Sequence, residues 1–309
     1  MGRIIFLNPF SKSEISGGIK TVYRHAEMLG ELGFRVHVYN PEGPPSWFET
    51  CAITQRALAP VAGDVLVFPD TLNGPLMQLA QAESAARKIM FCQNQYYMAL
   101  NPLAPESLVQ LGFSAFLCSS VSVRNFLASV FHVSDAPLIP CHVDPGIFFP
   151  REKSAQIACV PRKMPREARL LRAIFQAKYP QHLALLWKVI EDTTECEMAG
   201  ILGRSSIFLS LSFFESLGLV PLEAMASGCI VAGFDGYGGR EYATPANGCW
   251  FAPDHLEELA DALAAIADGL ERGDPAIAAM RKTGADTAAR YSKERTREAL
   301  REVYGRLMR

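Results

Sequence analysis

Short runs of apolar residues alternate along the whole chain with longer segments whose apolar side chains recur at helical spacing. After Gly17 and Gly18, for example, Ile19, Val22 and Ala26 share one face of a predicted helix. Such alternation is typical of a mostly parallel sheet covered by helices on both faces, so the sequence predicts an α/β fold. The expected strands are residues 4–7, 35–39, 65–68, 89–92, 115–118, 157–160, 183–190, 207–211 and 230–234, and the expected helices are residues 19–29, 73–83, 121–131, 166–179, 194–202, 221–227 and 256–270.

A proline-rich segment interrupts the alternation. Residues 137–150 contain four prolines and one glycine in 14 residues, and strand–helix alternation resumes after them. The length of 309 residues is also about twice that of a typical domain. We therefore expect two successive doubly wound units, the first covering residues 1–145 and the second residues 146–289.

The tail of the chain, residues 281–309, is predicted to be helical. Leu300, Val303, Tyr304 and Leu307 share one face, and the tail carries nine basic residues against four acidic ones. The basic excess has two explanations: the solvated face of a packing helix, or attraction to an anionic membrane surface.

Composition excludes several classes of partner. The net charge is −2, with 30 basic and 32 acidic side chains, whereas a protein that binds nucleic acid over its whole surface is strongly basic. The sequence has no run of 18 apolar residues, and the apolar run near its start is too short for a signal-peptide core. The eight cysteines and six histidines lack zinc-ligand spacing, so we expect no metal site and no nucleic-acid partner in a soluble, cytoplasmic protein.

Ligands of doubly wound sheets bind at the carboxyl ends of strands, so the loops after strands are the candidate sites. Gly17 and Gly18 precede a helix and suit a phosphate or a sugar oxygen, although a simple tight turn explains them equally well. Arg162, Lys163 and Arg166 place three cations after the expected strand 157–160. A guanidinium fork beside an ammonium group suits a diphosphate, and an exposed basic loop is the alternative.

The most informative loop follows the expected strand 207–211. Glu215 lies before a turn, Pro221 fits the first position of the next helix, and Glu223 would then fall in its first turn. A carboxylate at Glu223 either stabilises the helix dipole or accepts the two hydroxyls of a ribose. Glu215 would face another part of the same ligand.

Backbone amides extend this candidate site. Gly218, Leu219 and Val220 would direct their N–H groups from the helix N-terminus towards a bound anion. Three further glycines in residues 234–241 either allow close approach to a ligand or form a flexible turn.

The run from Glu215 to Glu223 matches the E-x7-E signature of retaining GT-B glycosyltransferases, and the sequence ESLGLVPLEAMASGCIVAG resembles the core motif of the GT4 family. Three other segments are similar to family segments: GGIKTVYRHAEMLGELGFRVHVY, CSSVSVRNFL and IPCHVDPGIFFP. The resemblance covers essentially the whole chain. It implies two Rossmann-like domains facing a cleft, an acceptor-side N-terminal domain, a C-terminal domain that holds the donor, and a last helix, residues 290–309, that packs back on the first domain.

The resemblance also implies roles for individual residues. Glu223 would bind the donor ribose, and Glu215 would contact the transferred sugar. Arg162 matches the arginine of the diphosphate-binding pair; its lysine partner often lies four residues later, where this chain has Arg166, and we favour the adjacent Lys163. The Gly17–Gly18 turn would lie against the donor phosphates or sugar. Where many members carry a histidine, this chain has residues 93–97, QNQYY.

The expected activity is therefore transfer of a sugar, with retention and without a metal or other cofactor, from a nucleoside-diphosphate sugar to a saccharide or lipid-linked saccharide. Cell-surface polysaccharide assembly is the process that this activity suggests, with the protein in the cytoplasm or peripheral at the inner face of the membrane. A nucleotide-sugar epimerase and a degenerate nucleotide-binding homologue without turnover are the alternatives. A nicotinamide-dependent dehydrogenase is disfavoured because the glycine fingerprint of dinucleotide-binding domains is missing.

Overall fold

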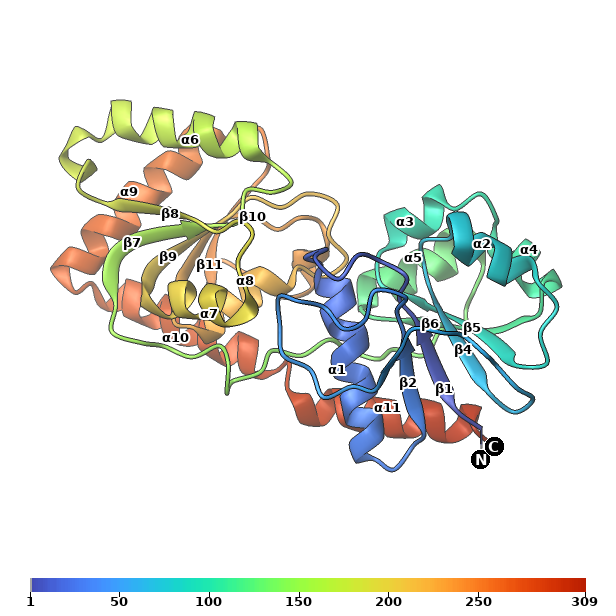
Figure 1. Ribbon diagram of the computed structural model, residues 1–309. Helices are drawn as coiled ribbons and strands as arrows, with labels where there is room; N and C mark the ends of the chain where they lie inside the picture. The colour runs from blue at the N-terminus through green and yellow to red at the C-terminus, as the bar shows by residue number, and fades with distance from the viewer. Residues whose placement is uncertain (1) are drawn as a thin grey trace. The chain divides into compact units, whose positions relative to one another are not determined.

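The computed structural model describes residues 2–309, which form two compact units (Figure 1). The first unit extends to Cys141 and also includes residues Lys293–Arg309 at the end of the chain. The second unit comprises residues His142–Ser292. The chain therefore leaves the first unit after Cys141 and returns to it at Lys293 for the last helix.

The first unit is built on a six-stranded, wholly parallel sheet in the order β3-β2-β1-β4-β5-β6. The strands are β1 (Ile4–Leu7), β2 (Val36–Tyr39), β3 (Thr54–Gln55), β4 (Val65–Pro69), β5 (Arg87–Cys92) and β6 (Phe113–Cys118). The helices are α1 (Gly17–Glu31), α2 (Gly74–Gln81), α3 (Gln95–Leu100), α4 (Pro105–Gln110), α5 (Val121–Phe131) and α11 (Lys293–Leu307).

Helices cover both faces of this first sheet. Alternate residues of β1 enter different cores: Ile4 and Phe6 pack with α1 and α11, whereas Ile5 and Leu7 pack with α2, α4 and α5. Because both faces are buried, the strand is a continuous apolar run rather than an alternating one.

The apolar face of α11 is covered by the first unit. Leu300 and Tyr304 are fully buried, and the Tyr304 ring lies 6.1 Å from the ring of Phe6. Thr296 Oγ1 donates a hydrogen bond to the carbonyl oxygen of Pro140 at 2.8 Å, near the point where α11 begins. Burial of Leu300 alone stabilises this docking by about 2 kcal/mol. The helix therefore uses its apolar stripe in the domain core, with basic side chains left on the outer face.

Two buried carboxylates brace the two ends of β4. Asp64 precedes the strand and accepts hydrogen bonds from the Arg3 side chain and from the backbone N–H of Arg3 at 2.8 Å. Burial opposes ionisation of Asp64, but these bonds and the Arg3 charge dominate and lower its pKa to about 2. Asp70 follows the strand and accepts the N–H groups of Gln93 at 2.7 Å and Asn94 at 2.5 Å. Burial raises the pKa of Asp70 to about 6, a shift opposite in direction to that of Asp64.

The second unit contains a five-stranded parallel sheet in the order β11-β10-β9-β7-β8. The strands are β7 (Ser154–Cys159), β8 (Leu186–Val189), β9 (Ser205–Ser210), β10 (Ile230–Phe234) and β11 (Gly248–Phe251). The α-helices are α6 (Pro165–Lys178), α7 (Glu195–Arg204), α8 (Leu219–Ala226), α9 (Leu256–Arg272) and α10 (Pro275–Ala289), and two 3₁₀ turns are η1 (Pro180–His182) and η2 (Gly238–Glu241).

This second sheet is also doubly wound. Helices α6 and α9 pack together on one face, where Leu171 and Phe175 of α6 meet Leu259 and Leu263 of α9. Helices α7, α8 and α10 lie on the other face (Figure 1). The predicted fold class, an α/β chain with two doubly wound parallel sheets, is confirmed.

The structure corrects several expected elements. β3, α3, α4 and β11 were not predicted, because each is six residues or shorter and carries little periodicity. The expected strand 183–190 is only Leu186–Val189, because a turn at residues 183–185 follows η1 and precedes the strand. The tail 281–309, predicted to be helical, forms the end of α10 and then α11, separated by residues 290–292, and the expected last helix 290–309 begins at Lys293.

Among residues 2–309, no helix has both the length and the apolar character required to cross a bilayer.

Candidate functional site

The carboxyl ends of β7 and β9 bring a lysine and a glutamate together. Lys163 lies in the loop after β7 and Glu215 in the loop after β9, and these strands are direct neighbours although 45 residues lie between the end of β7 and the start of β9. Lys163 Nζ is 2.7 Å from Glu215 Oε1, with 28% and 24% of the two side chains exposed. The pair is thus accessible to solvent while held in one geometry.

The loop after β10 fixes the backbone of Glu215. The N–H of Glu215 donates to the carbonyl oxygen of Gly236 at 2.9 Å, and Glu215 forms an isolated parallel bridge with Tyr237. A Cβ at Gly238 would lie 2.3 Å from the carbonyl carbon of Ser216, so only glycine permits this contact. The glycines of residues 234–241 therefore allow close approach to a neighbouring loop, a role that the sequence interpretation did not include.

Two non-glycine residues beside the pair have left-handed backbones. Phe214 has φ 55° and Tyr237 has φ 70°. Their rings pack on each other with centroids 5.8 Å apart. Strained conformations of this kind persist where surrounding contacts enforce them, and they concentrate at functional sites.

The start of α8 differs from the expectation. The N-cap is Gly218, with φ 81°, and the helix begins at Leu219, so Pro221 is its third residue rather than its first. Glu223 is therefore the fifth residue, beyond the first turn, and it is only 3% exposed. Interaction of Glu223 with the positive end of the helix dipole is weaker than predicted, because that effect falls off within one turn.

Gly218 itself is held by a buried tyrosine. The Tyr242 hydroxyl donates to the Gly218 carbonyl oxygen at 2.8 Å, and burial raises the pKa of Tyr242 well above its usual range. The hydroxyl thus remains a neutral donor. Leu219 and Val220 follow at the N-terminus of α8, where the first backbone N–H groups of a helix have no partner within the helix.

The other candidate residues occupy exposed positions. Arg162 lies beside Lys163 in the loop after β7, and Arg166 is the second residue of α6; both side chains are exposed. Gly17 and Gly18 are the first two residues of α1, in the first unit. A Cβ at Gly18 would lie 3.4 Å from the side-chain amide nitrogen of Gln93. Contact of these two glycines with a donor stays a prediction from the sequence.

Residues 93–97 occupy the region where many members of the GT4 family carry a histidine. They form the loop after β5 and the start of α3. Asp70 holds this loop through the two N–H groups described above. The Asn94 side chain caps α3 by accepting the N–H of Tyr96 at 2.9 Å. A buried carboxylate therefore fixes this loop in place.

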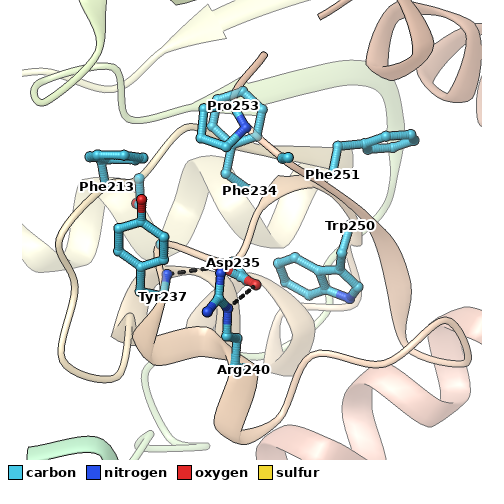
Figure 2. A pocket seen from close by; sticks show the side chains of 11 residues that line it. Phe213, Phe234, Asp235, Tyr237, Arg240, Trp250, Phe251 and Pro253 are labelled. Atoms are coloured by element: carbon cyan, nitrogen blue, oxygen red, sulfur yellow. Dashed lines mark hydrogen bonds and ion pairs between the residues drawn. The ribbon is translucent and has the colours of Figure 1, made fainter. Parts of the chain in front are cut away.

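A pocket of about 470 Å³ adjoins the Glu215 loop at the ends of β10 and β11 (Figure 2). Tyr237 and Trp250 line it from two sides of an ion pair in which Arg240 Nε is 3.1 Å from Asp235 Oδ2. Phe213 continues the aromatic wall, with its ring 4.9 Å from that of Tyr237. The sequence interpretation missed Trp250; the apolar run CWF between Gly248 and Pro253 was the signal for the strand that carries it.

The chemistry available at this edge is ionic and hydrogen-bonding. Burial raises the pKa of Cys159, at the end of β7, to about 11, so its thiol stays protonated near neutral pH and is a poor nucleophile. In the described part of the chain, no three His, Cys, Asp or Glu side chains gather in a metal-holding group. Three cations after β7, a helix N-terminus and an accessible carboxylate together suit a ligand that joins an anionic group to a hydroxylated one.

Comparison with known proteins agrees with this geometry. Residues 181–282 match the family described as Glycosyl transferases group 1, a range that contains Glu215, Glu223 and the pocket. An alpha-1,6-glucosyltransferase of Actinobacillus pleuropneumoniae serotype 7 is 30% identical over 178 residues, which are 56% of this chain. The match covers 53% of that protein, so the chain spans about half the length of this curated relative.

Solved structures share the fold over nearly the whole chain. Sucrose-phosphate synthase from Thermosynechococcus elongatus is 15% identical, with 99% of each chain covered and a TM-score of 0.73. A glycosyltransferase from Rickettsia africae is 12% identical over 100% of this chain and 99% of its own, with a TM-score of 0.69. The Anabaena protein Alr3699/HepE, solved with UDP and glucose, is 12% identical over 99% of each chain, with a TM-score of 0.65. The fold is thus of the GT-B type, with two Rossmann-like domains.

Proposed function

We propose that this protein is a glycosyltransferase that moves a sugar from a nucleoside-diphosphate sugar to a saccharide acceptor. The observation that carries the proposal is the meeting of Lys163 and Glu215, at 2.7 Å, beside the start of α8. A cationic loop and a carboxylate lie side by side at the sheet edge where ligands of doubly wound domains bind. The match of residues 181–282 to a glycosyltransferase family supports the same activity.

The proposed donor site divides according to charge. Arg162 and Lys163, with Arg166 as the alternative partner, bind the diphosphate, and the N-terminal amides of α8 add further N–H donors. These groups stabilise the charge that develops on the leaving nucleoside diphosphate, and no metal is needed for this step. Glu223 binds the ribose in this proposal, although the residue is only 3% exposed.

Glu215 acts on the transferred sugar in this proposal. As the bond between the anomeric carbon and the phosphate oxygen breaks, positive charge develops on the sugar ring, as in glycoside hydrolysis. The Glu215 carboxylate offsets that charge in the proposed mechanism. The E-x7-E spacing supports assignment to the retaining GT4 enzymes, with transfer to the same face of the sugar within a short-lived ion pair. The acceptor hydroxyl oxygen then replaces the phosphate oxygen at that carbon, and the hydroxyl proton passes to the departing diphosphate.

The acceptor is a saccharide, free or lipid-linked, and the process served is assembly of a cell-surface polysaccharide. A free acceptor places the reaction in the cytoplasm, and a lipid-linked acceptor brings the protein to the inner face of the membrane. In the second case, the basic outer face of α11 would contact anionic lipid, since its apolar face is buried in the first unit. Cosedimentation with anionic vesicles distinguishes the two locations.

The test is calorimetric titration of the purified protein with UDP, GDP, dTDP and ADP without added metal. UDP is titrated first because the similar Anabaena protein was solved with UDP and glucose. Saturable binding of one nucleotide supports the proposal and identifies the donor class. If a folded sample binds none of the four, the proposed donor site is wrong and a degenerate homologue becomes the better explanation.

Variants assign the roles. We expect Arg162→Ala and Glu223→Ala to weaken nucleotide binding, and Glu215→Ala to abolish transfer while nucleotide binding is kept. Unchanged nucleotide affinity in the first two folded variants would contradict the site, and near-normal turnover of the third would remove its catalytic role.

A further inference from the structure

The pocket at the ends of β10 and β11, lined by Phe213, Asp235, Tyr237, Arg240 and Trp250, has no part in the donor site described above. Its volume of about 470 Å³ lies within the range of small-molecule sites. We propose that it binds a neutral sugar ring of the acceptor saccharide. This inference rests on the proposed function, which supplies the reaction that such an acceptor would enter.

The walls suit the two kinds of surface that a pyranose ring presents. Its C–H faces are apolar and pack on aromatic rings, which Tyr237 and Trp250 supply from two sides (Figure 2). Its hydroxyl edges need hydrogen-bond donors and acceptors, which Asp235 and Arg240 supply between those rings. An aromatic lining with a few placed polar groups is the common form of a small-molecule site.

The polar pair is ordered before any ligand binds. Asp235 Oδ1 accepts the N–H of Tyr237 at 2.7 Å, and Asp235 Oδ2 lies 3.1 Å from Arg240 Nε. The Arg240 guanidinium also lies over the Tyr237 ring, 4.9 Å from its centroid. These contacts hold the guanidinium in place. The Arg240 side chain is 66% exposed, and its two terminal nitrogens are not used in the contact with Asp235 Oδ2. They can therefore donate to a pair of neighbouring hydroxyls.

Charge separates this pocket from the donor site. Asp235 and Arg240 together are neutral, so the pocket does not favour a phosphate as the three cations after β7 do. A neutral polyhydroxylated ligand fits this balance, because it needs hydrogen bonds without a compensating charge. The donor diphosphate is thereby directed to one part of the sheet edge and the neutral sugar to another.

The place of the pocket beside Glu215 distinguishes an acceptor sugar from the nucleobase, which is also neutral and planar. Two residues of the pocket wall hold the Glu215 backbone: the N–H of Glu215 donates to the carbonyl oxygen of Gly236, and Glu215 forms a parallel bridge with Tyr237. In a nucleoside-diphosphate sugar, the diphosphate separates the base from the transferred sugar. Since Glu215 is assigned to the transferred sugar, the pocket adjoins that sugar rather than the base. The group that must approach the transferred sugar in the reaction is the acceptor.

Fluorine NMR of the full chain labelled with 5-fluorotryptophan provides the test, because the chain has three tryptophans. Trp250 reports on the pocket, whereas Trp47 and Trp187 lie in other parts of the structure and serve as internal controls. Maltose, isomaltose and cellobiose are the probes. We expect at least one of them to shift the Trp250 signal saturably while the other two signals stay in place. No saturable shift with any probe, in a sample that binds a nucleotide, overturns this inference and leaves the proposed function intact.

Variants and competition sharpen the test. Arg240→Ala is expected to weaken saccharide binding about tenfold, from loss of charge-assisted hydrogen bonds, and to leave nucleotide affinity within about twofold. Arg272→Ala removes an exposed arginine at the end of α9 and is the matched control. Equal saccharide binding by both variants contradicts the role of Arg240. Displacement of the saccharide by UDP-glucose but not by UDP would show that the pocket holds the transferred sugar instead, which also overturns the acceptor assignment.

Discussion

The ion pair between Lys163 and Glu215 predicts an unusual effect of removing a proposed catalytic carboxylate. If Lys163 binds the donor diphosphate, it must first leave Glu215, from which its Nζ is separated by 2.7 Å in this structure. The free energy needed to break the ion pair then offsets part of the free energy of phosphate binding. Glu215→Gln removes the negative charge while it preserves the size of the side chain. We therefore expect this variant to bind UDP more tightly than the natural protein, although transfer is lost.

The size of the effect follows from exposure. With 28% and 24% of the side chains exposed, the pair is partly screened, and pairs of this kind contribute about 0.2–1 kcal/mol. The expected gain in UDP affinity is therefore about 1.5- to 5-fold. It should shrink as salt is raised from low to physiological concentration, because screening weakens the pair that the substitution removes.

Calorimetry on a double-mutant cycle tests the reasoning. Lys163→Met should weaken UDP binding, and adding Glu215→Gln to Lys163→Met should produce no further gain, because no lysine remains to be released. If folded Glu215→Gln binds UDP no more tightly than the natural protein, the idea that Lys163 leaves Glu215 to bind the diphosphate is refuted. If Glu215→Gln raises UDP affinity equally in the Lys163→Met background, the effect comes from the loss of a negative charge near the site and not from release of Lys163.

Three further predictions concern the supporting structure. The pKa of about 2 for Asp64 lies below its usual 3.8, so its pairing with Arg3 stabilises the fold above pH 4 by about 2 kcal/mol, and this contribution is lost as pH falls towards 2; urea unfolding of Asp64→Asn should show the full loss at pH 7 and about half of it at pH 3. Asp70 behaves oppositely, because its pKa of about 6 means that stability falls by about 3 kcal/mol as pH rises from about 3 to about 7; Asp70→Asn should abolish this slope, and an unchanged slope would contradict the assignment. Gly238→Ala introduces a Cβ that overlaps the Glu215 loop and should lower both the melting temperature and the transfer rate, whereas Gly305→Ala, where nothing lies within 4 Å, should lower neither.

Much of the fold was predictable because parallel strands buried on both faces appear in the sequence as short, continuous apolar runs. Residues 4–7 and 230–234 are wholly apolar, and the structure places strands there with every residue buried. The Gly-Gly start of α1 and the proline-rich segment 137–150 are likewise local features. The candidate loops could be chosen from the sequence alone, since every loop after a parallel strand reaches the same edge of its sheet.

Tertiary structure decided which of those loops meet. β8 follows β7 in sequence, yet β9 lies on the other side of β7, and this order brings Lys163 to Glu215. No local pattern encodes strand order, because it depends on how the helices of both faces pack. The left-handed backbone of Gly218, held by a hydrogen bond from Tyr242, likewise moved the start of α8 to Leu219.

The pocket is the clearest case of a feature that only the tertiary structure determined. Its walls come from three loops, from the end of β10 and from β11, a strand of four residues that pairs with β10 alone. So short a segment has too little periodicity to be recognised, and Trp250 acquires its place opposite Tyr237 only when β11 adds to the sheet. The sequence thus determined the types of chemical group and the edge at which they gather, because those depend on local patterns of burial. The sheet order, a non-local balance of packing, determined which groups became neighbours.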